Sequence, residues 1–321
     1  HDVFAIGYDD GCIRIWDSKI ATIIVGFNGH RSAITALCFD NSGVRLASGA
    51  KDTDVIVWDL VAEVGLFKLR GHKDQITGLE FIQPEVFPQE GSQVPRDTIT
   101  TAANSGTSDG FLITTGKDSL IKLWDIASQH CIETHVAQTS GECWALCISP
   151  DGSGCITAGN DGEIKVWSID ITGLYDFTQK LNGVLGIQFL KDRGVLHRQG
   201  KDKAIGIHFH PIQGYFCVHG SEKAVEVWRI RSDNEVRKSL ARKRKRRREK
   251  LAATADATAQ KETLDEDNDI SEKTEDLSSA DISEVFVPYV IVRTSGRVAS
   301  TDWVTSKSSK HIELLISTTN N

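Results

Sequence analysis

The chain has 321 residues, of which 40% are hydrophobic and 25% charged, and its formal net charge is −7. This is the composition of an ordinary soluble globular protein, and the modest net charge excludes no class of partner because an average hides local blocks. With no apolar run of about 18 residues and no leader pattern, neither a membrane span nor secretion is predicted. The chain begins within a strand pattern and contains no methionine, which indicates an excerpt of a longer protein.

Seven cysteines are present, and they show neither CxxC nor Cys/His zinc spacing. Four of them lie in apolar strand patterns: Cys38, Cys147, Cys155 and Cys217. The pattern predicts reduced thiols in the core of an intracellular protein, with no metal and no cofactor.

Short apolar runs follow one another along the first part of the chain. The first unit has runs at 3–7 and 12–17, separated by a turn at 9–11, with a last strand near 22–25. The second unit, 29–59, starts with Gly29-His30 and alternates apolar and small residues at 34–39 and 46–49. It ends with Trp58-Asp59. Alternation with a period of two, cut by Gly, Asn, Asp and Ser, predicts antiparallel strands. The second unit resembles one WD repeat, the four-stranded blade of a β-propeller.

Further units repeat this pattern. A third starts at Gly71-His72, pauses over a polar stretch at 83–110 that we interpret as a surface loop for protein contact, and ends near Trp124. A fourth runs from His135 to Trp167, and a weaker fifth from 205 to Trp228. The pattern returns at 285–321, which we interpret as the outer strand of the fifth blade and the start of a sixth.

These units predict an all-β WD-repeat β-propeller, with about five and a half blades of an expected seven. We expect propeller blades at 1–230, a charged insertion with a basic helix and an acidic disordered part at 231–284, and a return to the propeller at 285–321.

An acidic residue precedes the closing Trp by six positions in all five units: Asp10, Asp52, Asp118, Asp161 and Glu222. In WD repeats this residue holds a tight turn and accepts a hydrogen bond from the Gly-His histidine, which is linked to a strand Ser or Thr and to the Trp. The expected members of this network are His30, Ser48, Asp52, Trp58, His72, Thr114 or Thr115, Asp118, Trp124, Asp161 and Trp167.

Residues 231–284 break the strand pattern. From 237 to 250, ten Lys and Arg stand against one Glu without Gly or Pro, which favours a helix whose self-repulsion a polyanion would relieve. From 262 to 284, acidic residues lie among Ser, Thr and Ala, and this composition predicts disorder. The basic residues predicted to bind RNA or to direct nuclear import are Arg237, Lys238, Arg242, Lys243, Arg244, Lys245, Arg246, Arg247, Arg248 and Lys250.

The basic run has three interpretations: a nuclear localisation signal, a contact to a phosphate backbone, or merely a solvated surface helix. No aromatic residue is interleaved with it, so base stacking and sequence specificity are not expected. Elsewhere, Lys117 and Lys201 follow glycines without the spacing of a phosphate loop, and His208 and His210 lack a third metal ligand. No catalytic constellation is present, and the chain is predicted not to be an enzyme.

Three longer strings carry a more specific resemblance: 26–35 with 56–60, 131–135 with 141–144, and 225–230 running into the basic helix. Together they resemble the U3 small nucleolar RNA-associated protein 12 family, also called WD repeat-containing protein 3. The resemblance implies a nucleolar scaffold of the small-subunit processome, within the UtpB subcomplex. It implies as partners other tandem WD-propeller proteins, U3 small nucleolar RNA and the 5′ external transcribed spacer of pre-ribosomal RNA.

Two other classes of function remain open. A WD-repeat substrate receptor of a ubiquitin ligase would need a basic pocket for a degron on one propeller face. A Gβ-like signalling or trafficking propeller would be cytosolic and insensitive to RNase. Neither needs the polybasic insertion, which therefore separates them from the ribosome-assembly interpretation.

Overall fold

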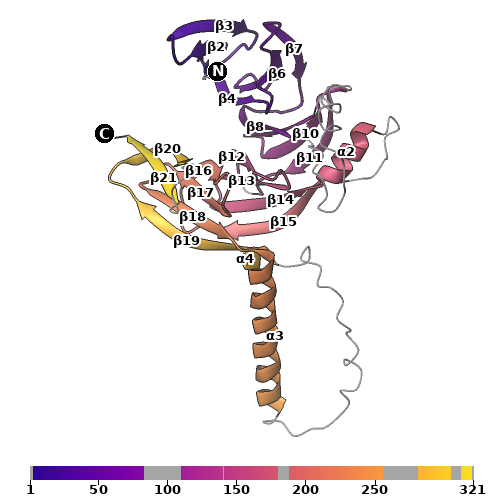
Figure 1. Ribbon diagram of the computed structural model, residues 1–321, viewed down its shortest axis with the longest axis vertical. Coiled ribbons are helices and arrows are strands. Elements are labelled where there is room, and N and C mark those ends of the chain that lie inside the picture. The colour runs from indigo at the N-terminus through magenta and orange to yellow at the C-terminus, as the bar shows by residue number, and fades with distance from the viewer. Residues whose placement is uncertain are drawn as a thin grey trace, which may run out of the picture.

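The computed structural model describes residues 3–82, 110–139, 141–179, 188–255, 281–304 and 312–319. Within these residues the strands form six antiparallel sheets, of which four have four strands, one has three and one has two. The sheets follow one another in chain order along a curved row (Figure 1). The predicted all-β propeller class is confirmed.

The first three sheets follow the predicted units. The first contains β1 (Val3–Gly7), β2 (Cys12–Asp17) and β3 (Thr22–Asn28). The second contains β4 (Ile34–Phe39), β5 (Arg45–Ala50), β6 (Val55–Asp59) and β7 (Val64–Leu69). The third contains β8 (Ile76–Ile82), β9 (Phe111–Gly116), β10 (Leu120–Asp125) and β11 (His130–Val136).

The later part of the chain contains three more sheets and the helices. The fourth contains β12 (Cys143–Ile148), β13 (Gly154–Gly159), β14 (Glu163–Ile169) and β15 (Leu190–His197). The fifth contains β16 (Ala204–Phe209), β17 (Tyr215–Gly220), β18 (Ala224–Ile230) and β19 (Phe286–Arg293), and the sixth β20 (Arg297–Val304) and β21 (Glu313–Thr319). The helices are α2 (Ile171–Gln179), α3 (Asp233–Ala255) and α4 (Ile282–Val285).

Hairpin turns between the strands have the residues that their geometry needs. Gly43 and Gly152 adopt φ of 69° and 70°, a conformation that a residue with Cβ rarely enters. Asp40 accepts hydrogen bonds from the backbone N–H of Val44 and Arg45 with its Oδ1, at 2.9 and 3.0 Å. Such Asx contacts fix where each hairpin reverses, and therefore which side chains face each side of the sheet.

The core consists of layers between consecutive sheets. Each of the five buried apolar clusters among the described residues draws its members from two neighbouring sheets. For example, Phe27 of the first sheet packs against Trp58 of the second, with ring centroids 4.8 Å apart. The innermost strands β4, β8, β12 and β16 also contact their successors, and β16 contacts β20. The second to fifth sheets are thus covered on both faces by their neighbours.

Two expectations for the fourth unit were wrong or incomplete. His135 does not open the fourth sheet, because it lies in β11, where it pairs with Ile121 of the third. No element was predicted between Trp167 and residue 205, whereas the structure has α2 and β15 there. β15 completes the fourth sheet by pairing with β14. Its sequence, LKDRGVLH, is too polar to give a strand signal and pairs only because β14 offers a free edge.

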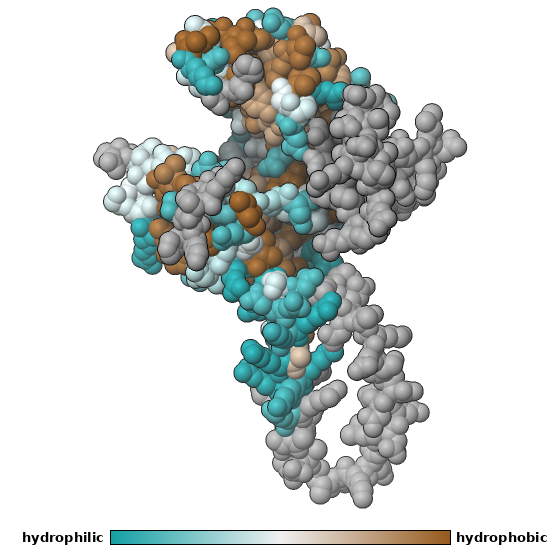
Figure 2. Space-filling model, viewed as in Figure 1, coloured by the Kyte–Doolittle hydropathy of each residue, from teal (hydrophilic) through white to brown (hydrophobic). Residues whose placement is uncertain are grey.

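Helix α3 leaves the propeller between β18 and β19 and projects from it as a rod (Figure 1). Its described surface is hydrophilic, in contrast to the brown apolar patches on the sheets (Figure 2). None of the helices, within the residues described, combines the length and apolarity required to cross a bilayer. All seven cysteines are free thiols, and burial raises the pKa of the Cys38 and Cys217 thiols to about 11.

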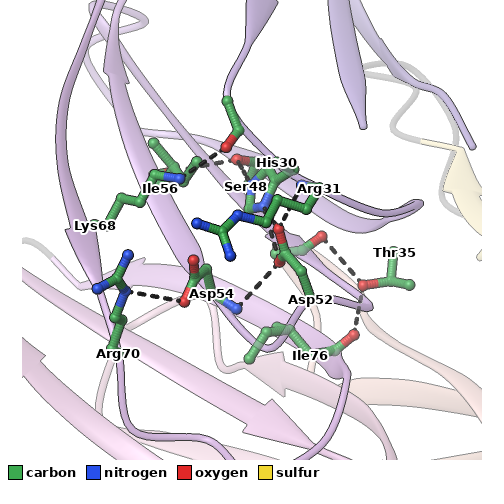
Figure 3. A network of polar contacts seen from close by, with 12 residues as sticks. His30, Arg31, Thr35, Ser48, Asp52, Asp54, Ile56, Lys68, Arg70 and Ile76 are labelled. Carbon is green, nitrogen blue, oxygen red and sulfur yellow. Dashed lines mark hydrogen bonds and ion pairs between the residues drawn. The ribbon is translucent and has the colours of Figure 1, made fainter. Parts of the chain in front are cut away.

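The second sheet carries a chain of buried polar contacts (Figure 3). His30 Nδ1 lies 3.1 Å from Asp52 Oδ1, and His30 Nε2 lies 2.8 Å from Ser48 Oγ. Trp58 Nε1 donates to the same Ser48 Oγ over 2.8 Å. Burial lowers the pKa of His30, which favours the neutral ring. Since a carboxylate only accepts, Nδ1 carries the proton, and Nε2 accepts from the Ser48 hydroxyl.

The third sheet repeats this chain with Thr in place of Ser. His72 lies 3.0 Å from Asp118 and 2.8 Å from Thr114 Oγ1, which also accepts from Trp124 Nε1 at 2.8 Å. Of the two threonines left open by the sequence, Thr114 makes the contact.

The fourth sheet has only part of this hydrogen-bond network, and the fifth sheet lacks its hydroxyl residue. In the fourth, Trp167 Nε1 donates to Thr157 Oγ1 over 3.1 Å, but Asp161 Oδ2 is buried without a hydrogen-bond partner in the described structure. In the fifth, Val218 takes the place of the hydroxyl residue, ten positions before Trp228. The indole N–H of Trp228 is accordingly buried and unpaired within the part of the chain described.

We predict that substitutions at Thr157 and Val218 change the stability of the fold in opposite directions. Thr157→Val removes the acceptor of Trp167 and should lower the free energy of unfolding by about 1–2 kcal/mol. Val218→Thr gives Trp228 an acceptor and should raise it by about 0.5–1 kcal/mol. Denaturant unfolding monitored by tryptophan fluorescence measures both. Destabilisation by both variants would contradict the assignment of Trp228 as a correctable defect.

Glu80 lies on the inner strand β8, at the interface with the fourth sheet. Its Oε2 accepts the backbone N–H of Ile148 over 3.0 Å. Although the residue keeps some exposed surface, loss of water around its carboxyl raises the pKa of Glu80 to about 7, against 4.5 for an unperturbed Glu. The folded chain therefore retains a proton that the unfolded chain releases between these two pH values.

We predict that Glu80→Gln removes part of the pH dependence of stability. Because the native state binds the extra proton, Glu80 lowers stability progressively as pH rises from about 4.5 to 7, and the loss persists above 7. The variant keeps an oxygen acceptor for Ile148 and should be more stable than the wild type at pH 8, by at most about 3 kcal/mol. At pH 5 the two should differ little. Thermal unfolding at both pH values tests this, and an equal difference at pH 5 and pH 8 would contradict it.

Candidate nucleic-acid interface

Helix α3 begins at the sequence Ser232-Asp-Asn-Glu235, which has the spacing of a capping box, and the structure forms the half of that box in which the Glu235 side chain accepts from Ser232. The Ser232 N–H donates to Glu235 Oε2 over 3.1 Å, and Arg229 of β18 donates to Glu235 Oε1 over 2.7 Å. The Ser232 and Arg229 donors hold the pKa of Glu235 below its usual value. Val236, in the first turn, is only 1% exposed. These contacts fix the direction in which the helix leaves the fifth sheet.

A second anchor joins α3 to α4, and we name it the Glu284 latch: Glu284, Ser239, Lys243 and Arg231. Glu284 is 5% exposed, and its Oε2 accepts from Ser239 Oγ at 2.8 Å. Lys243 Nζ forms an ion pair with Glu284 Oε1, and Arg231 Nη1 lies 3.6 Å from Oε2. A buried carboxylate needs such partners to remain ionised. The latch therefore holds the second and third turns of α3 against the propeller.

The latch corrects the prediction of disorder for 262–284. That prediction was wrong for 281–284, where Asp281 caps α4 by accepting from the Ser283 N–H at 3.2 Å. Ile282 packs in the core between the fourth and fifth sheets. Composition alone missed Glu284 because its partners lie more than 40 positions away in sequence. Residues 256–280 and the predicted contact loop at 83–109 lie outside the described residues.

The basic run is arranged along one rod. A helix of 23 residues rises about 35 Å. Arg237, Lys238, Arg242, Arg244, Lys245 and Arg246 are exposed on it, as is most of Lys243, whose ammonium pairs with Glu284. Lys245 also lies 4.0 Å from Glu249, an exposed pair that stabilises little. Arg247, Arg248 and Lys250 lie within α3, but their side chains are outside the description.

This arrangement can bind a polyanion electrostatically. Like charges three and four positions apart each destabilise a helix by about 0.2–0.5 kcal/mol, and phosphate groups beside them would remove that repulsion. The described surface of the run carries no aromatic side chain for base stacking, in agreement with its sequence.

The histidines considered as metal ligands, His208 and His210, pack against other aromatic rings. His208 stacks on His219 with ring centroids 6.3 Å apart, and His210 packs against Trp303 at 5.3 Å. Burial lowers the pKa of all three histidines. No group of three or more His, Cys, Asp or Glu side chains suited to a metal ion occurs among the residues that the structure describes.

We predict that breaking the latch exposes the base of α3 to protease. Glu284→Gln leaves Lys243 and Arg231 without their carboxylate and should speed trypsin cleavage after Arg237 and Lys238 several-fold. The control is Glu249→Gln, the same chemical change at an exposed ion pair, which should leave the rate unchanged. Mass spectrometry of the fragments identifies the bonds cut. Equal rates in the wild type and Glu284→Gln would show that the latch does not restrain the helix.

Comparison with known proteins agrees with this architecture. The family model described as the WDR3 first β-propeller domain matches residues 1–169, more than half of the chain. U3 small nucleolar RNA-associated protein 12 of Saccharomyces cerevisiae is 36% identical over 325 residues, which cover 100% of this chain and 28% of the yeast protein. The chain thus spans little more than a quarter of that relative.

More distant relatives match only part of the chain. Nuclear distribution protein PAC1 of Arthroderma otae is 27% identical over 180 residues, covering 54% of this chain and 35% of that protein. Autophagy-related protein 16 of Arabidopsis thaliana is 22% identical over 163 residues, covering 51% and 27% respectively. The match to the family model and the similarity to the yeast protein over the whole of this chain together establish that the chain belongs to the WDR3 first β-propeller family.

Proposed function

We propose that this chain is a non-catalytic scaffold in ribosome biogenesis, acting in the small-subunit processome on pre-18S ribosomal RNA. Within that particle we assign it to the UtpB subcomplex, with other tandem WD-propeller proteins as protein partners. U3 small nucleolar RNA and the 5′ external transcribed spacer are the proposed RNA partners, and the nucleolus is the proposed location.

The observation that carries the proposal is the anchored basic helix. The Glu284 latch and the capping box hold the base of α3, the helix projects from the propeller (Figure 1), and its described Lys and Arg residues are exposed. A rigid rod of positive charge contacts phosphates without first losing the conformational freedom of a flexible tail. Contact with the sugar-phosphate backbone would be insensitive to sequence, as suits a scaffold on folded RNA.

The similarity to U3 small nucleolar RNA-associated protein 12 supports the choice of RNA and particle. The propeller supports the scaffold role, because sheets buried against one another present turns on two faces and outer strands on a rim. The proposal assigns the faces to protein partners and α3 to RNA or nuclear import.

We predict that replacing Arg244, Lys245, Arg246 and Arg247 by Gln decreases both retention on pre-ribosomal RNA and nuclear localisation. For binding to single-stranded RNA, the slope of log K against log salt should become shallower by up to about 2.8, that is, about 0.7 for each phosphate that the chain no longer neutralises. RNA binding at several salt concentrations, and sedimentation with and without RNase, measure the effect.

The matched control removes four exposed cations from the propeller: Arg31, Lys51, Lys73 and Lys201, each replaced by Gln. It changes the net charge equally and should alter the salt slope little. If the α3 variant keeps wild-type localisation and RNA retention, the role of the basic run is rejected. If both variants lose RNA equally, the binding depends on net charge and not on α3.

A further inference from the structure

We propose that Ser239 is a phosphorylation site for a serine/threonine kinase that recognises basic residues, and that the phosphate opens the Glu284 latch. This inference does not depend on the proposed RNA function, because it concerns only the attachment of α3 to the propeller.

The residues around Ser239 suit such a kinase. Arg237 and Lys238 precede it directly, Leu240 follows, and Arg242 and Lys243 stand three and four positions after it. Kinases that prefer basic substrates bind these side chains through acidic pockets, so that opposite charges meet across the interface. Ser239 is partly exposed, and Arg237, Lys238 and Arg242 are exposed.

The chemistry transfers one phosphoryl group from ATP. The Ser239 Oγ forms a bond to the γ-phosphorus, the bond from that phosphorus to the bridging oxygen breaks, and ADP leaves with the electron pair. The hydroxyl proton passes to the catalytic base of the kinase. In the latched state this proton is donated to Glu284 Oε2 at 2.8 Å. The hydroxyl must therefore leave the latch before it can react.

The phosphate cannot return to the position of the hydroxyl. Phosphoserine carries a charge of about −1.5 to −2 at pH 7, and it would face the buried carboxylate of Glu284 as a like charge. Lys243, four positions later on α3, lies within reach of the phosphate and would exchange Glu284 for it. Arg231, at 3.6 Å, would remain as the cation beside Glu284. Phosphorylation thus breaks both the hydrogen bond from Ser239 and the ion pair from Lys243.

Phosphorylation of Ser239 therefore changes how α3 is attached to the propeller, and α3 remains helical. A phosphate at Ser239 paired with Arg242 and Lys243 favours the helix, because residues three and four apart are neighbours on its surface. The latch, however, is the contact between α3 and α4, so the helix stays folded while its second and third turns detach. The phosphate also lowers the net positive charge of α3 near the end that joins the propeller.

The test phosphorylates the complete chain with the catalytic domain of an arginine-directed serine/threonine kinase and Mg-ATP. Mass spectrometry locates the phosphate, and hydrogen exchange reports on the latch. The Arg231 N–H donates to Val285 O at 2.8 Å and the Glu284 N–H to Asp281 O at 2.9 Å, so peptides containing these amides are the readout. We expect phosphate on Ser239 and at least fivefold faster exchange in both peptides, with little change within α3 beyond Lys243.

Two variants make the result specific. Glu284→Gln frees the Ser239 hydroxyl from its charged acceptor and should be phosphorylated several-fold faster than the wild type, whereas Glu249→Gln should not. Ser239→Ala, without phosphate, loses one hydrogen bond and should change exchange much less than the phosphorylated chain. Failure to phosphorylate Ser239 even in Glu284→Gln would overturn the proposal. So would unchanged exchange after phosphorylation, or an equal change in Ser239→Ala. None of these measurements uses RNA, so their failure leaves the proposed function standing.

Discussion

The second to fifth sheets of this protein each have two apolar faces, and the neighbouring sheets cover most of both. A single blade of this kind cannot bury its own hydrophobic faces and depends on stacking against its neighbours. Here every buried cluster of the described residues joins two consecutive sheets, and the closing tryptophans Trp58, Trp124, Trp167 and Trp228 each pack toward the preceding sheet. The stability of one blade is therefore inseparable from that of the next, and rigidity of the surface turns follows from this mutual burial.

The hydrogen-bond network of histidine, hydroxyl and indole contributes less to stability than this apolar packing. In the second and third sheets, one hydroxyl serves both a histidine and an indole, and all its members are buried and paired. In the fifth sheet the hydroxyl is replaced by Val218, yet the sheet still forms. Instead, Arg198 lies 3.2 Å from Asp202 and 3.4 Å from Glu226 at the junction with the fourth sheet. The fold tolerates loss of the network because the apolar layers supply most of the free energy.

Rigidity matters most where α3 leaves the propeller. A rod with ten Lys and Arg from 237 to 250 has no apolar face of its own to bury beyond its first turns. Its direction depends on Val236, on the capping box and on one buried carboxylate, Glu284. Glu284 lies in α4, which leads directly into β19, and β19 pairs with β18, the strand from which α3 departs. Strand pairing thus places the carboxylate beside Ser239, and the latch is a product of the propeller itself.

Local sequence was enough to predict the repeating strands, their turns, the closing tryptophans and the charge of the insertion. Period-two alternation, Asp and Gly at turns and like-charge clustering each act within a few residues. Other features were set only by packing in three dimensions: that LKDRGVLH forms β15, that His135 belongs to the third sheet, that Thr114 and not Thr115 meets His72, and that Glu284 is buried. These outcomes depend on which strand edge is free and on which groups meet across 40 or more residues. No local pattern contains that information, because the partners are brought together only when the sheets pack.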